Sequence, residues 1–535
     1  MKKKIVSTLF LSLIPGFLLF AQPQLIRDIQ PGNLSGVIGQ IVAADGKLYF
    51  VGNDGINGPE LWMSDGTESV TVLVKDIRSG MFGSFPEQLR VMDNKVLFRA
   101  NDGNTGNEIW VSDGTLAGTT LLRDIVPGNG SANPSELTVI NGLLYFNADS
   151  PSGQEPWISD GTEAGTMELK DINENGDSYP FHFTFASGMV FFSADDGVNG
   201  LELWKTDGTG DGTVVVKNIF PGTGSAWPEK LAEHNGILYF SADDGSHGAE
   251  LWRSDGTESG TYMLKDINPG NPGSDIDEIT SVGDLIFFRA NDGLHGPEVW
   301  KSDGTEAGTV LITDLYPGNS NFYLPVSLTP FGNSLIYVGF SDALIGEELY
   351  ITDGSQSGTA LIADIFPGGL SSDPAFLFNL GEAIYFQADD GVHGHELWKT
   401  DGTPSGTMMV ADINPGAAPS GPANFELYAN TLYFSASENS VGNELWKITD
   451  VTNEIDEAAP ITDIRYFPNP VTSQLTIANM NAEIHQLSLF DVAGNLVKEK
   501  EISVSLCQLD LSRLSEGIYM VVINRGQYVG KVVKR

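Results

Sequence analysis

Residues 250–261 read Glu-Leu-Trp-Arg-Ser-Asp-Gly-Thr-Glu-Ser-Gly-Thr, and this pattern returns nine times in the 535-residue chain. An aromatic residue anchors each copy, and successive anchors lie 47 to 50 residues apart. The anchors are Trp62, Trp110, Trp157, Trp204, Trp252, Trp300, Tyr350, Trp398 and Trp446. A fixed period of this length is typical of a repeat architecture, in which each copy forms one supersecondary unit.

One copy divides into four short, mostly apolar stretches separated by turn sequences. Around Trp252 the stretches are residues 230–233, 237–242, 250–253 and 261–266. Asn-Gly or Asp-Gly dipeptides stand between them, and these accept the positive backbone angles of tight hairpins. We therefore expect one antiparallel four-stranded sheet per copy. Because a single sheet of this size cannot bury its apolar faces, the sheets must stack.

The two ends of the repeat region complement each other. A fourth-strand sequence reaching Asp28 precedes the first complete copy, and the last copy, around Trp446, lacks its fourth strand. Completing the last sheet with the N-terminal strand closes a ring, which predicts an all-β fold: a β-propeller of about nine four-stranded blades over residues 22–448. Nine exceeds the usual four to eight blades. An eight-bladed ring with one copy set aside and two smaller rings are therefore the alternatives.

The composition limits the possible partners. The chain carries 70 acidic and 29 basic residues, a formal net charge of -41, which disfavours nucleic acid and anionic membranes. Divalent cations, basic proteins and neutral glycans stay open. Cys507 is the only cysteine, which excludes an internal disulfide and a multi-cysteine metal site.

The first residues have the pattern of an export signal. Three lysines at positions 2–4 precede an apolar run over residues 5–20, and the small residue Ala21 stands before Gln22. This predicts an export signal peptide over residues 1–21, with cleavage between Ala21 and Gln22. No other stretch is apolar enough to span a bilayer, so no transmembrane segment is expected in the mature protein.

Residues 25–446 resemble the ELWxxDGT repeats of large secreted bacterial proteins. The resemblance implies a propeller-like repeat protein and brings no established catalytic activity. The Ser-Asp-Gly-Thr hairpin is also similar to the Asp-box turn of sialidase propellers. Here the tryptophan precedes the aspartate, so sialidase chemistry is not carried over.

The composition changes after the last copy. Residues 449–464 are polar and acidic, lack the repeat and are expected to form a linker. Residues 465–535 alternate apolar and polar positions between glycine turns, as the strands of a small β-sandwich do.

This last segment also carries four ordered motifs. They are Pro-Asn-Pro at 468–470, Leu-Phe-Asp-x-x-Gly at 489–494, Leu-x-x-Gly-Ile-Tyr at 514–519 and Lys-Val-Val-Lys at 531–534. In this order they resemble the type A C-terminal sorting domain of the type IX secretion system of Bacteroidetes. The resemblance implies Sec export, recognition of residues 465–535 by the type IX machinery and passage across the outer membrane. The sorting domain would then be removed, and the protein would be secreted or lie on the outer cell surface.

The loop between the second and third strands carries an aspartate and a glutamate in seven copies. Carboxylates and carbonyls at such turns are ligands that calcium prefers, so calcium is the cofactor that the sequence suggests. The alternative is structural: the aspartate stabilises the turn, and the glutamate caps the sheet edge. The candidate ligands are Asp54, Glu60, Asp102, Glu108, Asp196, Glu202, Asp244, Glu250, Asp292, Glu298, Asp342, Glu348, Asp390 and Glu396.

Contact with a ligand is expected where the repeat is broken. Trp227 lies outside the motif, and His182 and Tyr323 lie in two further departures from the consensus. His393 and His395 flank a glycine in one loop and form the best local histidine pair. Equivalent histidines on other blades would lie roughly 10 Å apart per blade, too far to share one metal ion.

The sequence gives no catalytic assignment. No nucleophile elbow, zinc-helix motif or phosphate loop is present. The leading hypothesis is a non-enzymatic, secreted or cell-surface propeller that acts as an adhesion module for an extracellular glycan or protein. The alternatives are a secreted carbohydrate-active enzyme on a propeller scaffold and a calcium-stabilised structural spacer.

Overall fold

The computed structural model describes residues 22–318, 325–341 and 344–449 of the repeat region. Near the C-terminus it describes residues 464–467, 472–479, 484–490, 496–504, 506–512, 514–515, 517–523 and 528–534. The signal peptide proposed for residues 1–21 lies outside the described residues. By its internal contacts the chain divides into two units, with the boundary between residues 451 and 452.

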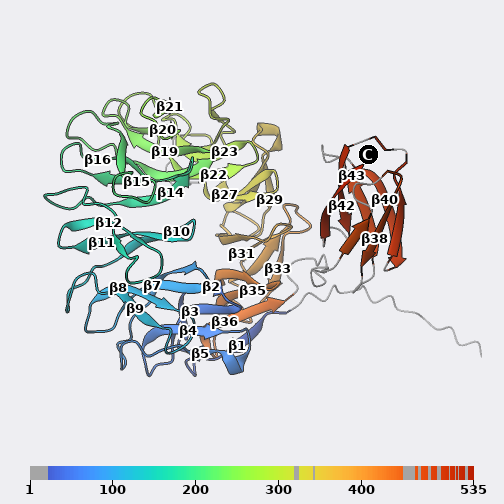
Figure 1. Ribbon diagram of the computed structural model, residues 1–535, viewed down its shortest axis with the longest axis horizontal. Coiled ribbons are helices and arrows are strands. Elements are labelled where there is room, and N and C mark those ends of the chain that lie inside the picture. The colour runs from blue at the N-terminus through green and yellow to red at the C-terminus, as the bar shows by residue number, and fades with distance from the viewer. Residues whose placement is uncertain are drawn as a thin grey trace, which may run out of the picture. The chain divides into compact units, whose positions relative to one another are not determined.

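The first unit consists of nine four-stranded antiparallel sheets, the blades, arranged in a ring (Figure 1). Blade 1 contains β2 (Val37–Ala44), β3 (Lys47–Asn53), β4 (Pro59–Ser64) and β5 (Val72–Leu73). Blade 2 contains β6 (Glu87–Met92), β7 (Lys95–Asn101), β8 (Asn107–Ser112) and β9 (Thr120–Arg123). Blade 3 contains β10 (Ser135–Ile140), β11 (Leu143–Ser150), β12 (Gly153–Ser159) and β13 (Met167–Glu168). Blade 4 contains β14 (Phe181–Ala186), β15 (Met189–Asp195), β16 (Leu201–Thr206) and β17 (Val214–Lys217). Blade 5 contains β18 (Glu229–His234), β19 (Ile237–Asp243), β20 (Ala249–Ser254) and β21 (Tyr262–Lys265). Blade 6 contains β22 (Asp277–Val282), β23 (Leu285–Asn291), β24 (Pro297–Ser302) and β25 (Val310–Leu311). Blade 7 contains β26 (Val326–Phe331), β27 (Ser334–Phe340), β28 (Glu347–Thr352) and β29 (Ala360–Ala363). Blade 8 contains β30 (Ala375–Asn379), β31 (Ile384–Asp389), β32 (His395–Thr400) and β33 (Met408–Ala411). Blade 9 contains β34 (Ala423–Tyr428), β35 (Thr431–Glu438) and β36 (Gly442–Thr449), and β1 (Gln24–Arg27) completes it. Two short 3-10 helices, η1 (Glu68–Val70) and η2 (Gln356–Gly358), lie in hairpins between third and fourth strands.

The ring closes as the chain ends predict. Strand β1 pairs antiparallel with β36, with Leu25 opposite Trp446, and so supplies the missing fourth strand of blade 9. Blade 1 then hydrogen-bonds to blade 9: Gly36 N donates to Asn443 O at 3.0 Å, and Ala43 N donates to Glu426 Oε1 at 3.1 Å. Nine blades in one closed ring are confirmed, and the eight-bladed and two-ring alternatives are wrong.

The core lies between blades, because each sheet packs its apolar face on the next. One cluster joins Tyr239 and Leu251 of blade 5 to Phe288 and Trp300 of blade 6, all less than 9% exposed. A basic side chain on the fourth-strand segment covers the tryptophan of the following blade. Lys265 Nζ lies 5.9 Å from the Trp300 ring centroid and donates to Thr309 O at 2.7 Å.

We call this contact the blade clasp, and it recurs around the ring. The basic residues that lie over the tryptophan of the following blade are Arg27, Lys75, Arg123, Lys170, Lys217 and Lys265. Each also donates to a main-chain carbonyl of the motif hairpin in that blade. Because Arg27 belongs to β1 and covers Trp62, the clasp also spans the closure of the ring.

The second unit contains two antiparallel sheets. One has the order β37 (Ile464–Phe467), β38 (Gln474–Asn479) and β41 (Leu506–Asp510). The other has the order β40 (Leu496–Val504), β39 (Ile484–Phe490), β42 (Gly517–Ile523) and β43 (Tyr528–Lys534). Among the described residues of both units, no helix is long and apolar enough to cross a membrane.

Candidate binding surface at the mouth of the propeller

The glutamate of the repeated motif is buried on the third strand of every blade. Glu60 Oε1 accepts the backbone N–H groups of Arg78 and Ser84 at 3.0 and 2.9 Å, and Oε2 accepts the Ser84 hydroxyl. The carboxylate thus holds the connection from one blade to the next. Its equivalents, each between 0 and 4% exposed, are Glu108, Glu155, Glu202, Glu250, Glu298, Glu348, Glu396 and Glu444.

Burial sets the acidity of these glutamates. Removal from water raises the pKa of Glu60 and Glu250 from 4.5 to about 7, although the hydrogen bonds from the connection oppose this change. For Glu298 the same cause raises the pKa to about 8. A buried acid of this kind, bonded mainly to backbone N–H groups, fits a structural role.

The loop aspartates make different contacts. Asp54 Oδ1 accepts the N–H groups of Ile56 and Asn57, both at 2.8 Å, which is an Asx turn. Burial acts to raise the pKa of Asp54, but these hydrogen bonds outweigh it and hold the pKa below its usual value. The same turn contacts are made by Asp102, Asp196, Asp244, Asp292 and Asp390. Asp342 lies outside the described residues.

The structure thus gives the aspartate and glutamate of one loop separate sets of hydrogen-bond donors. Among the residues that the structure describes, no group of three or more His, Cys, Asp or Glu side chains is placed to hold a metal ion. Calcium at these loops stays a prediction.

The loop histidines each bind one aspartate of their own turn. His247, His295 and His393 place Nδ1 at 2.8, 2.7 and 2.7 Å from a carboxylate oxygen of Asp244, Asp292 and Asp390. This hydrogen bond raises the pKa of each of the three histidines. His395 opens strand β32 and pairs with Asp389 of β31, so the two histidines of this loop belong to different parts of it.

Trp227 marks a position that recurs at the start of seven of the nine innermost strands. We call this set the mouth positions: Phe85, Asn133, Tyr179, Trp227, Asp275, Asp373 and Gly421, all with φ between +44° and +54°. At each position, the mouth residue or the residue before it donates its N–H to a carbonyl at the start of the third strand. Phe85 N, for example, donates to Pro59 O at 3.1 Å. The backbone is therefore shared, while the side chain differs from blade to blade.

His182 belongs to a second left-handed position, three residues further along the innermost strand at a β-bulge. Here too the side chains differ, and several reach the neighbouring blade. Glu136 Oε2 accepts His182 N at 3.0 Å, and Glu278 Oε2 accepts Leu328 N at 2.7 Å. His182 therefore lies at the boundary between two innermost strands. Tyr323 lies outside the described residues.

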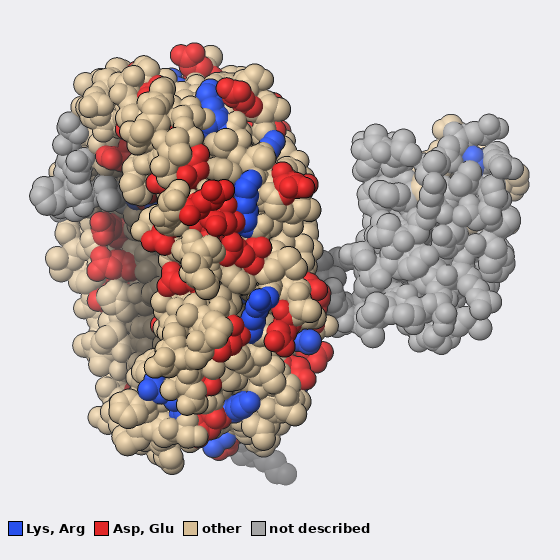
Figure 2. All heavy atoms as spheres, turned by 60° about the vertical axis from the view of Figure 1, so that its left-hand side comes forward, with Lys and Arg blue, Asp and Glu red and all other residues tan. Residues whose placement is uncertain are grey.

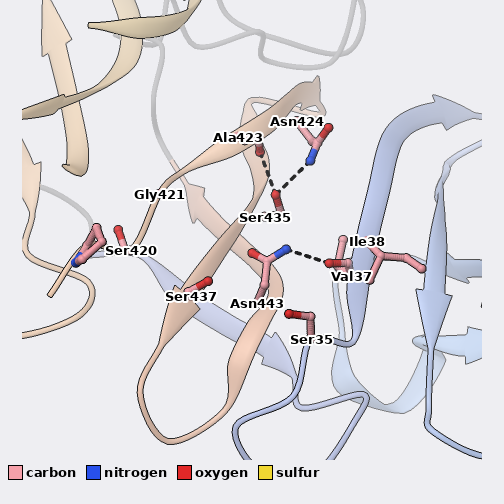
Figure 3. A pocket seen from close by; sticks show the side chains of 11 residues that line it. Ser35, Val37, Ile38, Ser420, Gly421, Ala423, Asn424, Ser435, Ser437 and Asn443 are labelled. Carbon is pink, nitrogen blue, oxygen red and sulfur yellow. Dashed lines mark hydrogen bonds between the residues drawn. The ribbon is translucent and has the colours of Figure 1, made fainter. Parts of the chain in front are cut away.

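A hollow of about 540 Å³ opens where blade 9 meets blade 1 (Figure 3). It includes the mouth position Gly421, and Figure 3 shows Asn443 bridging the two blades to the Val37 carbonyl at 2.6 Å. Ser435 accepts from Asn424 at 3.0 Å on the same wall. The lining is neutral and rich in hydroxyl and amide groups, with Ser35, Ser437 and the half-exposed Ile38.

Acidic residues outnumber basic ones in the chain, 70 to 29. Figure 2 shows them gathered in patches on one side of the propeller, with basic side chains interspersed. This distribution follows from the formal net charge of -41. A surface of this sign attracts cations and basic partners over a distance of about 10 Å at moderate ionic strength.

Two comparisons bear on the sequence. Residues 465–535 match the family model described as "Secretion system C-terminal sorting domain". This confirms the type IX sorting domain, indicates export to the cell surface or secretion, and implies interaction with the type IX machinery. No curated protein matches the sequence.

Solved structures give remote likenesses. PorZ, described as a surface component of the type IX secretion system of Porphyromonas gingivalis, is 11% identical with a TM-score of 0.33, over 94% of this chain and 75% of that chain. Prolyl oligopeptidase B from Galerina marginata is 11% identical with a TM-score of 0.36, over 74% of this chain and 56% of that chain, so the chain spans about half the length of that peptidase. The β-propeller domain of the Trilobed protease from Pyrococcus furiosus is 12% identical with a TM-score of 0.32, over 62% of this chain and 99% of that chain.

Proposed function

We propose that this protein is a non-enzymatic binding module that the type IX system delivers to the cell surface or the medium. It binds an extracellular glycan or protein at the mouth of the propeller. One observation carries this proposal: the motif side chains engage in internal contacts, whereas the mouth positions share a backbone and vary in side chain. Trp227, 58% exposed, and the hollow at Gly421 are two such departures from the repeat.

The test is binding of the purified protein to arrays of glycans and of purified extracellular proteins. Two variants change the mouth, Trp227→Ala and Ser437→Trp, the second of which fills the hollow. Leu116→Ala is the matched control, because Leu116 is 68% exposed in the hairpin between β8 and β9, at the opposite end of the blade.

We expect specific binding without turnover, weakened at least tenfold by a mouth variant and unchanged by the control. Binding that responds equally to all three variants contradicts a site at the mouth. Hydrolysis of a chromogenic glycoside that is lost on substitution of one acidic residue supports the enzyme instead.

A further inference from the structure

Three mouth positions carry large exposed aromatic side chains. Phe85, Tyr179 and Trp227 are 55, 45 and 58% exposed and belong to blades 2, 4 and 5. We call these three residues the aromatic arc. The repeated tryptophans of the chain are between 4 and 9% exposed, so Trp227 differs from every other tryptophan.

The backbone at these positions does not favour aromatic residues. Their φ angles are +49°, +46° and +49°, in the left-handed region that bulky side chains avoid. Other blades place Asn133, Asp275 or Gly421 here, and residues of these types adopt this conformation more readily. The arc therefore costs folding stability while its rings gain little burial, which points to a role in binding.

Carboxylates lie close to Tyr179 of the arc. Tyr179 Oη donates to Asp177 Oδ2 at 3.0 Å, and the charges of Asp149 and Asp195 also act on this phenol. A ring face next to carboxylates is an environment that attracts a cation.

Two basic side chains close in sequence to the arc are paired with acids. Lys230 Nζ lies 3.0 Å from Asp277 Oδ1, and Arg99 forms an ion pair with Glu87. The charges of these two basic groups are thus neutralised by acids.

We propose that the aromatic arc binds a Lys- or Arg-rich segment of a partner protein, by cation–π contact with the rings and by attraction to the carboxylates. This rests on the proposed binding function and names the class of its partner. Charge complementarity favours this occupant over a neutral glycan.

The probe is a short peptide of alternating Lys and Gly, compared with the same peptide acetylated on every lysine, which removes the charge. Because Trp227 is the exposed tryptophan, protection of the protein's fluorescence from acrylamide quenching reports binding at the arc. The test variant, Phe85→Asn with Tyr179→Asn, keeps this reporter and leaves the net charge unchanged. Leu116→Asn is the control.

We expect the charged peptide to protect Trp227, the acetylated peptide not to, and the double variant to bind at least tenfold more weakly. The melting temperature of the double variant should equal or exceed that of the parent, because asparagine suits the left-handed backbone. Equal affinity for parent and double variant, or for both peptides, overturns the proposal. If a glycan from the array binds and requires the arc, while the peptide does not bind, the proposed basic partner is wrong but the proposed binding function stands. If no ligand on any array binds, both proposals are wrong.

Discussion

At the scale of single residues, the motif glutamate stabilises the connection between two blades, although its sequence resembles that of a surface loop. Glu250 accepts the N–H groups of Ile267 and Asn268 at 2.8 and 3.2 Å, at the point where the chain leaves blade 5. Both donors lie in the connection to the next blade, so this one side chain orders a segment that forms no ladder of its own.

Replacing Glu250 by alanine should therefore destabilise the propeller. Because buried N–H groups are left without an acceptor, we expect a loss of about 3 kcal/mol in the free energy of unfolding. Chemical denaturation at pH 7 measures it. Glu258→Ala, on the exposed hairpin of the same blade, is the control and should change the free energy by less than about 0.5 kcal/mol.

The same glutamates predict the pH dependence of stability. Their folded pKa, about 7 for Glu60, Glu108 and Glu250, lies above the ordinary 4.5, so between these values the folded state keeps protons that the unfolded chain has lost. Stability from this source is full below about pH 4.5 and falls as the pH rises through 7. The loop aspartates act in the opposite sense, because their pKa is lowered and their contribution is lost in acid.

We therefore expect a higher melting temperature at about pH 5 than at about pH 8, with a second fall below about pH 4. Differential scanning calorimetry across this range measures it. A melting temperature that rises steadily from pH 5 to pH 8 would contradict a dominant role for the buried glutamates.

At the scale of elements, the four-residue strand β1 contributes to ring closure in two ways. Strand β1 covers the edge of β36, and its Arg27 forms the blade clasp on Trp62. Without β1, blade 9 keeps an unpaired edge and blade 1 loses its clasp.

Deletion of residues 22–27 should lower the melting temperature by several degrees and make the two blades at the seam sensitive to protease, because β1 supplies both the edge pairing and the clasp. Limited proteolysis with mass spectrometry locates the cuts. Deletion of residues 22–23, which precede β1, is the control, and equal resistance of both deletions would show that the ring does not need the strand.

At the scale of the whole molecule, the two units have separate tasks. Residues 465–535 match a sorting domain, and the nine blades contain the mouth surface.

Deleting residues 465–535 should leave a folded propeller that stays in the periplasm, because the type IX machinery has lost its recognition element. Cell fractionation measures the location, and protease resistance of the retained protein checks that it is folded. Normal appearance at the cell surface would contradict the sorting function.

The sequence predicts much of the architecture but little of the binding surface. Trp227 and His182 stand out as breaks in the repeat, and both lie at the mouth. Phe85 is not recognisable as a mouth residue from its own sequence, because Ser-Phe-Pro is typical of an ordinary loop. Aligning the copies on their anchor aromatics would have placed Phe85, Tyr179 and Trp227 in one column, each 25 residues before an anchor and each followed by proline.

The fold class, the number of blades and the closing strand follow from the sequence. Eight blades pair only strands that are neighbours in the chain, and the incomplete first and last copies complement each other in the ninth. The tertiary structure decides which residues are buried and which lie at the mouth of the propeller. Glu60 looks exposed in a loop sequence, yet it is buried, because its donors Arg78 and Ser84 come from the connection that follows. The seam hollow combines Ile38 with Gly421, residues nearly 400 positions apart that meet only when the ring closes.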